Sequence, residues 1–96
     1  LRPSALDVLG LPDALESYFR KGAARCRPPL TVTVRRSGEE PVLTPEQSLA
    51  LYRICQEAIN NVLKHSGAAR AGLEVNGERD RLTLRVWDDG CGLDPD

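Results

Sequence analysis

The chain has 96 residues, of which 41% are hydrophobic and 28% are charged, and its formal net charge at pH 7 is -1. This mix is typical of a soluble globular protein, and the length allows one domain with a modest core. The near-zero net charge gives no sign of the positively charged surface that nucleic-acid binding needs. No apolar run is long enough to span a membrane.

The cysteines and the single histidine argue against a zinc site or a disulfide framework. Cys26, Cys55 and Cys91 are far apart and form no Cys-x-x-Cys pair, and His65 is the one histidine. This usage is typical of a reducing compartment, so we expect a cytoplasmic segment. No signal peptide is visible, and we expect no direct membrane contact by this segment, although its parent chain could be membrane-anchored.

The first part of the chain reads as an initial segment, a helix and a strand. Residues 1–10 form a start without a helix cap. Pro12 suits the first turn of a helix over Leu11–Arg25, and Pro28 ends it. Leu30–Arg36 alternates apolar residues with threonines, which predicts a strand. The helix end carries a run of cations that we expect to be solvated: Arg20, Lys21, Arg25 and Arg27.

A long helix and a β-hairpin are predicted next. Thr44-Pro45-Glu46-Gln47 is a strong helix start, and the helix continues to His65. Strands near Ala69–Val75 and Arg81–Asp88 flank Asn76-Gly77-Glu78-Arg79, which reads as the hairpin connection. The order helix, strand, helix, strand, strand predicts an α/β two-layer sandwich with helices on one face of a mixed sheet.

The long helix carries a polar row beside its apolar face. The apolar stripe has the spacing of a face packed on a core: Leu49, Tyr52, Cys55, Ala58, Ile59, Val62 and Leu63. Glu57, Asn61 and Lys64 lie together at the edge of this stripe or beyond it. Asparagine is a poor helix former, so Asn60 and Asn61 in mid-helix suggest selection for something other than folding. Taken alone, such a row is more often an ordinary solvated helix face.

A second motif lies at the end of the last predicted strand. Asp88 falls in register with the apolar residues of that strand, so we expect its carboxylate to point toward the core, where it is costly without a donor. Gly90 and Gly92 then let the backbone turn and approach a ligand closely. On its own, this motif is more often a simple Asp-Gly turn.

Together and in this order, the two motifs resemble the ATP-binding catalytic domain of sensor histidine kinases. The match to that family's N box lies at Glu57, Asn61, Lys64 and His65. The match to its first glycine box, Asp-x-Gly-x-Gly, lies at Asp88, Gly90 and Gly92. Upstream, Leu1-Arg2-Pro3 and Leu9-Gly10-Leu11 resemble the subfamily paired with response regulators of the nitrate-response type. The resemblance covers essentially the whole chain.

The resemblance implies the Bergerat fold, with ATP between the sheet and the long helix. It implies that Asp88 accepts a hydrogen bond from the exocyclic amine of adenine and that Gly90 and Gly92 let the backbone lie against the purine.

On the phosphate side, the resemblance implies that Asn61 ligates Mg²⁺ through its amide oxygen and that Lys64 offsets phosphate charge. Glu57, as the catalytic residue, would lie near the attacking nucleophile or a metal-bound water. His65 would be either close to the phosphates or structural.

By the same resemblance, the γ-phosphoryl group of ATP passes to a histidine on a separate dimerisation domain of a homodimeric kinase that works with a response regulator. His65 is not expected to be that acceptor. We expect residues 1–10 to be the linker from the dimerisation hairpin and residues 11–96 to be a partial catalytic domain, incomplete at the C-terminus before the second glycine box and the lid. Two alternatives stay open: another ATPase or serine kinase of this superfamily, and a non-catalytic interaction module.

Overall fold

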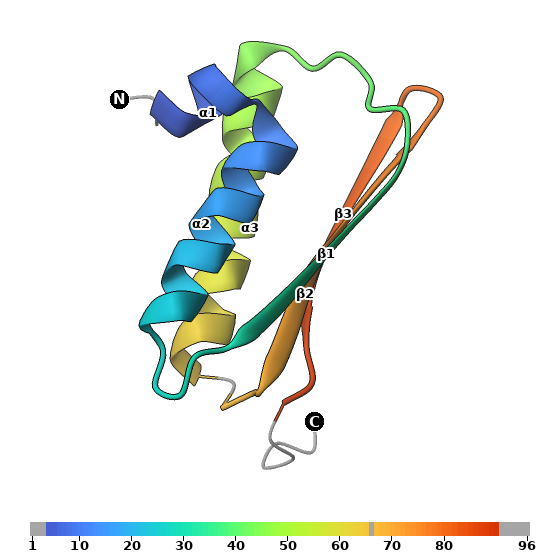
Figure 1. The fold of residues 1–96 in the computed structure, drawn as a ribbon. Coiled ribbons are helices and arrows are strands. Elements are labelled where there is room, and N and C mark those ends of the chain that lie inside the picture. Colours follow the sequence, from blue (N-terminus) through green and yellow to red (C-terminus); the bar gives the residue numbers. More distant parts are fainter. Residues whose placement is uncertain (1–3, 66, 91–96) are drawn as a thin grey trace.

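The computed structural model describes residues 4–65 and 67–90. Within these residues the elements are α1 (Ser4–Leu9), α2 (Leu11–Arg25), β1 (Thr31–Gly38), α3 (Pro45–His65), β2 (Arg70–Glu78) and β3 (Arg81–Asp88). The helices lie together on one face of the sheet (Figure 1). The predicted two-layer α/β architecture is confirmed. No helix in the described ranges is long and apolar enough to cross a membrane.

The sheet is mixed, with the strand order β1-β2-β3. β1 runs parallel to β2, with Val34 opposite Leu73, and β2 runs antiparallel to β3, with Leu73 opposite Val86. Two parallel neighbours need a crossover connection, and α3 provides it. β2 is therefore the central strand, and the side chains that it turns toward the helices are buried: Ala71, Leu73 and Val75.

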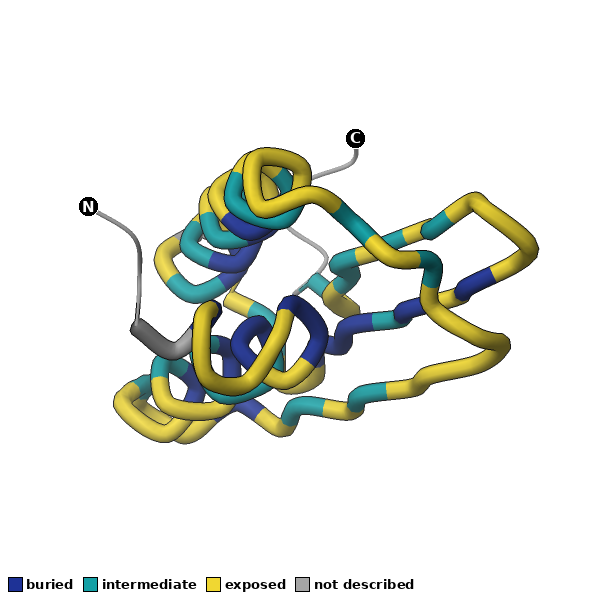
Figure 2. The backbone as a smooth tube through the Cα atoms, turned by 90° about the horizontal axis from the view of Figure 1, so that it is seen from above, coloured by how far each residue is buried: buried dark blue, intermediate teal, exposed yellow. Residues whose placement is uncertain are grey.

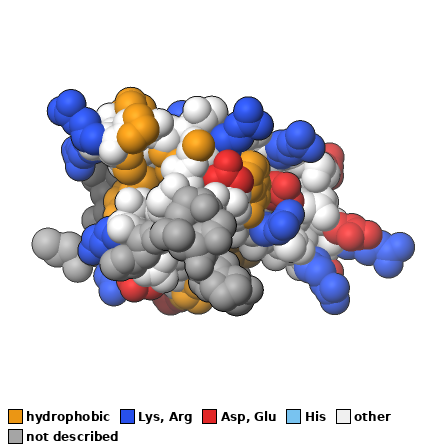
Figure 3. Space-filling view, turned by 90° about the horizontal axis from the view of Figure 1, so that it is seen from below, with side chains coloured by type: hydrophobic (Ala, Val, Ile, Leu, Met, Phe, Trp, Pro, Cys, Tyr) orange, Lys and Arg blue, Asp and Glu red, His pale blue; other side chains and the backbone are white. Residues whose placement is uncertain are grey.

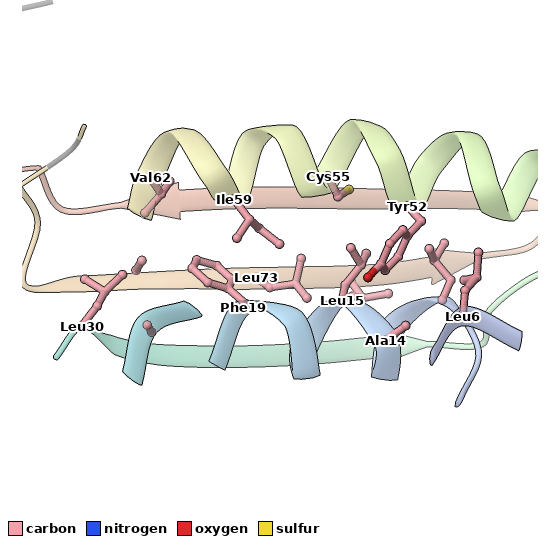
Figure 4. Packing of buried hydrophobic residues seen from close by; sticks show 14 residues of the cluster. Leu6, Ala14, Leu15, Phe19, Leu30, Tyr52, Cys55, Ile59, Val62 and Leu73 are labelled. Atoms are coloured by element: carbon pink, nitrogen blue, oxygen red, sulfur yellow. The ribbon is translucent and has the colours of Figure 1, made fainter. Parts of the chain in front are cut away.

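The core lies between the sheet and the α2–α3 pair. Phe19 of α2, Ile59 of α3 and Leu73 of β2 are each 0% exposed and meet in this layer (Figure 4). Seen from above, the buried positions of both helices face inward (Figure 2). The predicted apolar stripe of α3 is confirmed, because all its members are buried or half-buried: Leu49, Tyr52, Cys55, Ala58, Ile59, Val62 and Leu63.

The start of α3 has the predicted capping box. Thr44 Oγ1 accepts a hydrogen bond from the Gln47 N–H at 3.0 Å, and Gln47 Oε1 accepts one from the Thr44 N–H at 2.9 Å. These reciprocal bonds pair donors that the first turn of a helix leaves without intrahelical partners. The residue at which α3 begins is thereby fixed by its own sequence.

Residues Ser4–Leu9 form a short helix, although the sequence predicted a linker over residues 1–10. Leu6 is 6% exposed and belongs to the core, which explains why this segment docks on the rest of the chain. Gly10, with φ 85°, then turns the chain into α2, a conformation that glycine adopts without steric cost. The division into a linker and a domain beginning at residue 11 stays a prediction.

The predicted hairpin connection at Asn76-Gly77-Glu78-Arg79 was wrong. β2 continues through residue 78, and Arg79-Asp80 makes the turn, with φ 59° at Arg79. Gly77 is glycine for another reason, because a Cβ there would collide with the carbonyl oxygen of Glu39. Gly38 lies opposite Gly77 and is equally close to its backbone. The two glycines let the end of β1 and the following loop pass close to β2.

Trp87 covers Gly72 on the sheet face that points away from the helices. The two residues are opposite each other in the β2–β3 register, and a Cβ at Gly72 would collide with the indole ring. Gly72 is consequently buried and Trp87 is half-buried, although both lie on the outer face. This contact stabilises the end of β3 that leads into Asp88.

Replacing Gly72 with alanine is expected to lower the free energy of unfolding by about 1–3 kcal/mol, because the added methyl group forces the indole of Trp87 to move. The matched control is Gly22→Ala, where the added methyl group comes as close to the terminal Cδ1 of Leu63. That side chain is flexible and can turn aside, and the helical position gains propensity, so a smaller loss is expected. Urea denaturation measures both changes. Equal stability of Gly72→Ala and the unchanged protein would contradict the role given to the contact.

Candidate functional site

The candidate site lies at the end of the molecule where α3 and β3 both terminate. The two elements run side by side in the same direction, so the last turns of α3 reach the level of the β3 arrowhead (Figures 1 and 4). Asp88, the last residue of β3, therefore lies toward the same end of the molecule as Asn61 and Lys64 in the last turns of α3, and Glu57 lies about two turns before the helix end. Figure 3 shows this end from below, with lysine and arginine side chains at several points of its margin.

Three predicted N-box side chains are exposed on α3, namely Glu57, Asn61 and Lys64. None of them forms a hydrogen bond or an ion pair within residues 4–65 and 67–90. Their carboxylate, amide and ammonium groups are therefore available to a ligand. His65 is the last residue of the helix, and its side chain lies outside the described part of the chain.

The neighbouring asparagine, Asn60, has a structural partner. The Tyr18 hydroxyl donates a hydrogen bond to Asn60 Oδ1 at 2.7 Å and so ties α2 to α3. The Tyr18 ring also packs edge-on against Tyr52, with 6.3 Å between the ring centroids. Folding thus accounts for Asn60, which corrects the expectation for that residue, and leaves Asn61 as the asparagine without a structural role.

Asp88 lies on the predicted face of β3, the face of Val86 that turns toward the helices, but it is exposed, so the expected cost of burying its carboxylate does not arise. It lies opposite Ala71 at the end of the β2–β3 ladder. β3 is an edge strand of the described sheet, and its apolar residues on the same face are only half-buried: Leu82, Leu84 and Val86. The Asp88 carboxylate has no partner among the described residues and faces solvent, where it carries no desolvation cost.

Asp89, which sequence reasoning missed, anchors the turn that follows β3. Its Oδ1 accepts hydrogen bonds from the N–H groups of Ala69 at 3.1 Å and Arg70 at 3.2 Å. Its own N–H donates to the carbonyl oxygen of Arg70 at 3.0 Å. No local pattern in the sequence predicts these bonds, because the amides that Asp89 accepts from lie 19 and 20 positions earlier in the chain.

The glycines of the second motif are partly described. Gly90 has φ 58°, the left-handed conformation that glycine adopts without steric cost, and the turn predicted from Gly90 and Gly92 together stays a prediction. Gly92 and Cys91 lie outside the described residues, and the role of Gly92 stays a prediction.

A metal at this site would depend on few protein ligands. No group of three or more His, Cys, Asp or Glu side chains that could hold a metal ion occurs in the described ranges. Asn61 offers an amide oxygen, a hard ligand that suits Mg²⁺ when water and phosphate oxygens complete the coordination. Cys55 lies on the buried face of α3, and burial raises the pKa of its thiol, which disfavours the reactive thiolate.

Comparisons with known proteins point to one family. A family model described as histidine kinase-, DNA gyrase B-, and HSP90-like ATPase matches residues 46–96. The chain is 38% identical over 94 residues to the sensor histidine kinase MctS of Rhizobium johnstonii, covering 98% of this chain and 20% of MctS. It is 37% identical over 95 residues to the signal transduction histidine-protein kinase/phosphatase UhpB of Salmonella typhimurium, covering 99% of this chain and 19% of UhpB.

A further relative is the signal transduction histidine-protein kinase/phosphatase DegS of Bacillus subtilis, which is 34% identical over 94 residues. The match covers 97% of this chain and 24% of DegS. The chain thus spans about a fifth to a quarter of the length of these curated relatives.

Replacing Tyr18 with phenylalanine is expected to lower the free energy of unfolding by about 0.5–1.5 kcal/mol, because it removes the hydrogen bond to Asn60 and keeps the ring. The control is Tyr52→Phe, since the Tyr52 hydroxyl has no hydrogen-bond partner among residues 4–65 and 67–90. Urea denaturation compares the two variants. Similar losses at Tyr18 and Tyr52 would show that the Tyr18–Asn60 bond does not stabilise the helix pair.

Proposed function

Because the chain belongs to the family of histidine kinase-, DNA gyrase B- and HSP90-like ATPases, we propose that it forms the ATP-binding catalytic part of a sensor histidine kinase. Membership of the family implies ATP binding. The relatives matched along nearly the whole chain are histidine kinases by name, which favours this function over a gyrase-like ATPase, a serine kinase or a non-catalytic module.

The placement of four unpartnered polar side chains carries this proposal. Glu57, Asn61, Lys64 and Asp88 are all exposed and come from two elements that end at the same side of the molecule. A solvated helix face explains the first three separately, but it does not explain a free carboxylate at the end of the adjacent strand. A nucleotide with its base at β3 and its phosphates along α3 would contact all four of these side chains.

At the base, Asp88 accepts a hydrogen bond from the exocyclic amine of adenine. Guanine carries a carbonyl oxygen at the equivalent ring position, which a carboxylate repels, so the same group provides discrimination. Gly90 supports this contact because the absence of a side chain lets the backbone approach the flat face of the purine. Gly92 is proposed to do the same.

At the phosphates, Asn61 provides the amide oxygen for Mg²⁺, and Lys64, one turn further along α3, offsets phosphate charge. When bound, the metal neutralises charge that develops on the phosphates during transfer. His65 is proposed to lie near the phosphates or to support the helix end.

Glu57 is the residue we propose as catalytic. It lies one turn before Asn61 on the exposed side of α3 and can orient the attacking imidazole or accept its proton. The nucleophile is a histidine on a separate dimerisation domain of a homodimer, and it receives the γ-phosphoryl group of ATP. A response regulator then receives that group. We propose a cytoplasmic location for the segment, which free thiols such as Cys26 and Cys55 support because a reducing compartment keeps them reduced.

Asp88→Asn in the full-length protein is expected to weaken ATP binding by about 1–3 kcal/mol, the range for a disrupted buried hydrogen bond, because the amide can present a donor to the adenine amine. Isothermal titration calorimetry measures the change. Asp80→Asn is the control, since Asp80 is an exposed aspartate in the β2–β3 turn at the opposite end of the strand. Unchanged ATP affinity in a folded Asp88→Asn protein would rule out base recognition by this residue.

Asn61→Ala is expected to reduce the part of ATP affinity that depends on magnesium and to spare adenosine binding, because it removes an oxygen ligand near the phosphates only. Asn60→Ala is the matched control one position earlier, where the same change breaks the bond to Tyr18 and leaves the polar row intact. Titrations with and without Mg²⁺ separate the two contributions. An equal loss of adenosine affinity in Asn61→Ala would show that Asn61 acts through the helix and not through the metal.

A further inference from the structure

We infer that Asp89 is a positioning residue that holds Asp88 where it can read the adenine base. This inference rests on the proposed function of Asp88. The two aspartates are neighbours but have different surroundings: the Asp88 carboxylate is free, whereas one oxygen of Asp89 is shared between the backbone N–H groups of Ala69 and Arg70.

The hydrogen bonds of Asp89 begin where the sheet ladder ends. Asp88, opposite Ala71, is the last paired residue of β3. Beyond it, the Asp89 N–H donates to the Arg70 carbonyl oxygen at 3.0 Å, and Asp89 Oδ1 accepts from two amides of the same segment. Three hydrogen bonds thus hold Asp89, the residue that follows Asp88. They keep the end of β3 in register, although the end of an edge strand otherwise frays.

The same bonds connect the two motifs of the site. Ala69 lies in the short connection between the end of α3 and the start of β2, and its carbonyl oxygen also accepts a hydrogen bond from the Thr31 N–H at 3.0 Å. The segment that receives Asp89 is therefore held by β1 as well. Through it, Asp89 ties the end of β3 to the segment that leads from α3 into β2.

The conformation after Asp89 is also constrained. Gly90 has φ 58°, a left-handed conformation that glycine adopts without steric cost. With the ladder on one side and the hydrogen-bonded Asp89 on the other, the Asp88 backbone has little freedom. A carboxylate that must distinguish an amine from a carbonyl oxygen needs such a fixed position, because a mobile one adapts to both bases.

The test compares Asp89→Ala with Asp89→Asn in the full-length protein. Alanine removes the acceptor, whereas asparagine keeps an oxygen at the same place and loses only the charge. We expect Asp89→Ala to lower the ratio of ATP affinity to GTP affinity about tenfold and Asp89→Asn to stay within about threefold of the unchanged protein, as expected when one acceptor is lost or kept. Calorimetric titration with each nucleotide gives the ratios.

Base selectivity separates positioning from general stability. If Asp89→Ala weakens ATP and GTP binding equally, Asp89 is merely structural and the inference is overturned. If Asp89→Asn loses the preference for ATP over GTP as completely as Asp89→Ala, the selectivity depends on the charge of Asp89 and not on its acceptor oxygen. That result also overturns the inference. If Asp88→Asn leaves the ratio unchanged, the proposed function of Asp88 fails, and the inference fails with it.

A second measurement needs no nucleotide. Amide hydrogen exchange at Ala69 and Arg70 is expected to accelerate at least severalfold in Asp89→Ala and to stay slow in Asp89→Asn, because only the first variant frees these N–H groups. Asp80→Ala, at the other end of β3, is the control and should leave both amides unchanged. Unaltered exchange in Asp89→Ala would show that these hydrogen bonds do not hold in solution, and the inference would be withdrawn.

Discussion

The packing of one face of α3 on the sheet is the constraint from which the site follows. Tyr52 and Ile59 are inserted between the sheet and α2, which fixes the rotation of the helix about its axis. The capping box at Thr44 fixes where the helix begins. With rotation and start both set, Glu57 and Asn61 can point only outward. The polar row therefore needs no contact of its own to be held, and it stays free for a ligand.

Structural features that depend on residues close together in the sequence were predictable from the sequence. The capping box, the stripe of α3 and the strand alternations depend on residues a few positions apart, and the structure confirms them. Features set by distant segments were not. Gly77 looked like a turn residue but makes room for Glu39, α1 forms because Leu6 reaches the core, and Asp88 is exposed because β3 is an edge strand. No window of a few residues contains that information.

The candidate site divides in the same way. Motif spacing singles out Glu57 and Asn61, and α3, which carries them, ends on the same side of the molecule as β3, which ends at Asp88. Motif spacing was not enough to find the residues that support them. Tyr18 contacts α3 across 42 positions of sequence, and Asp89 reaches back to a segment 19 and 20 positions earlier. Such contacts depend on how the elements pack, which the motifs do not specify.

Two neighbouring pairs show how the chain separates folding from binding. In the pair Asn60–Asn61, the Asn60 side chain forms a hydrogen bond within the protein and the Asn61 side chain does not. In the pair Asp88–Asp89, the bonded side chain is that of Asp89 and the free one is that of Asp88. The bonded residue gains stability from its hydrogen bonds and immobilises the shared backbone. The free residue costs the fold nothing, because water solvates its side chain. A ligand then replaces only that water at a residue whose backbone is already held, so only the rotamer freedom of the side chain remains to be lost when it binds.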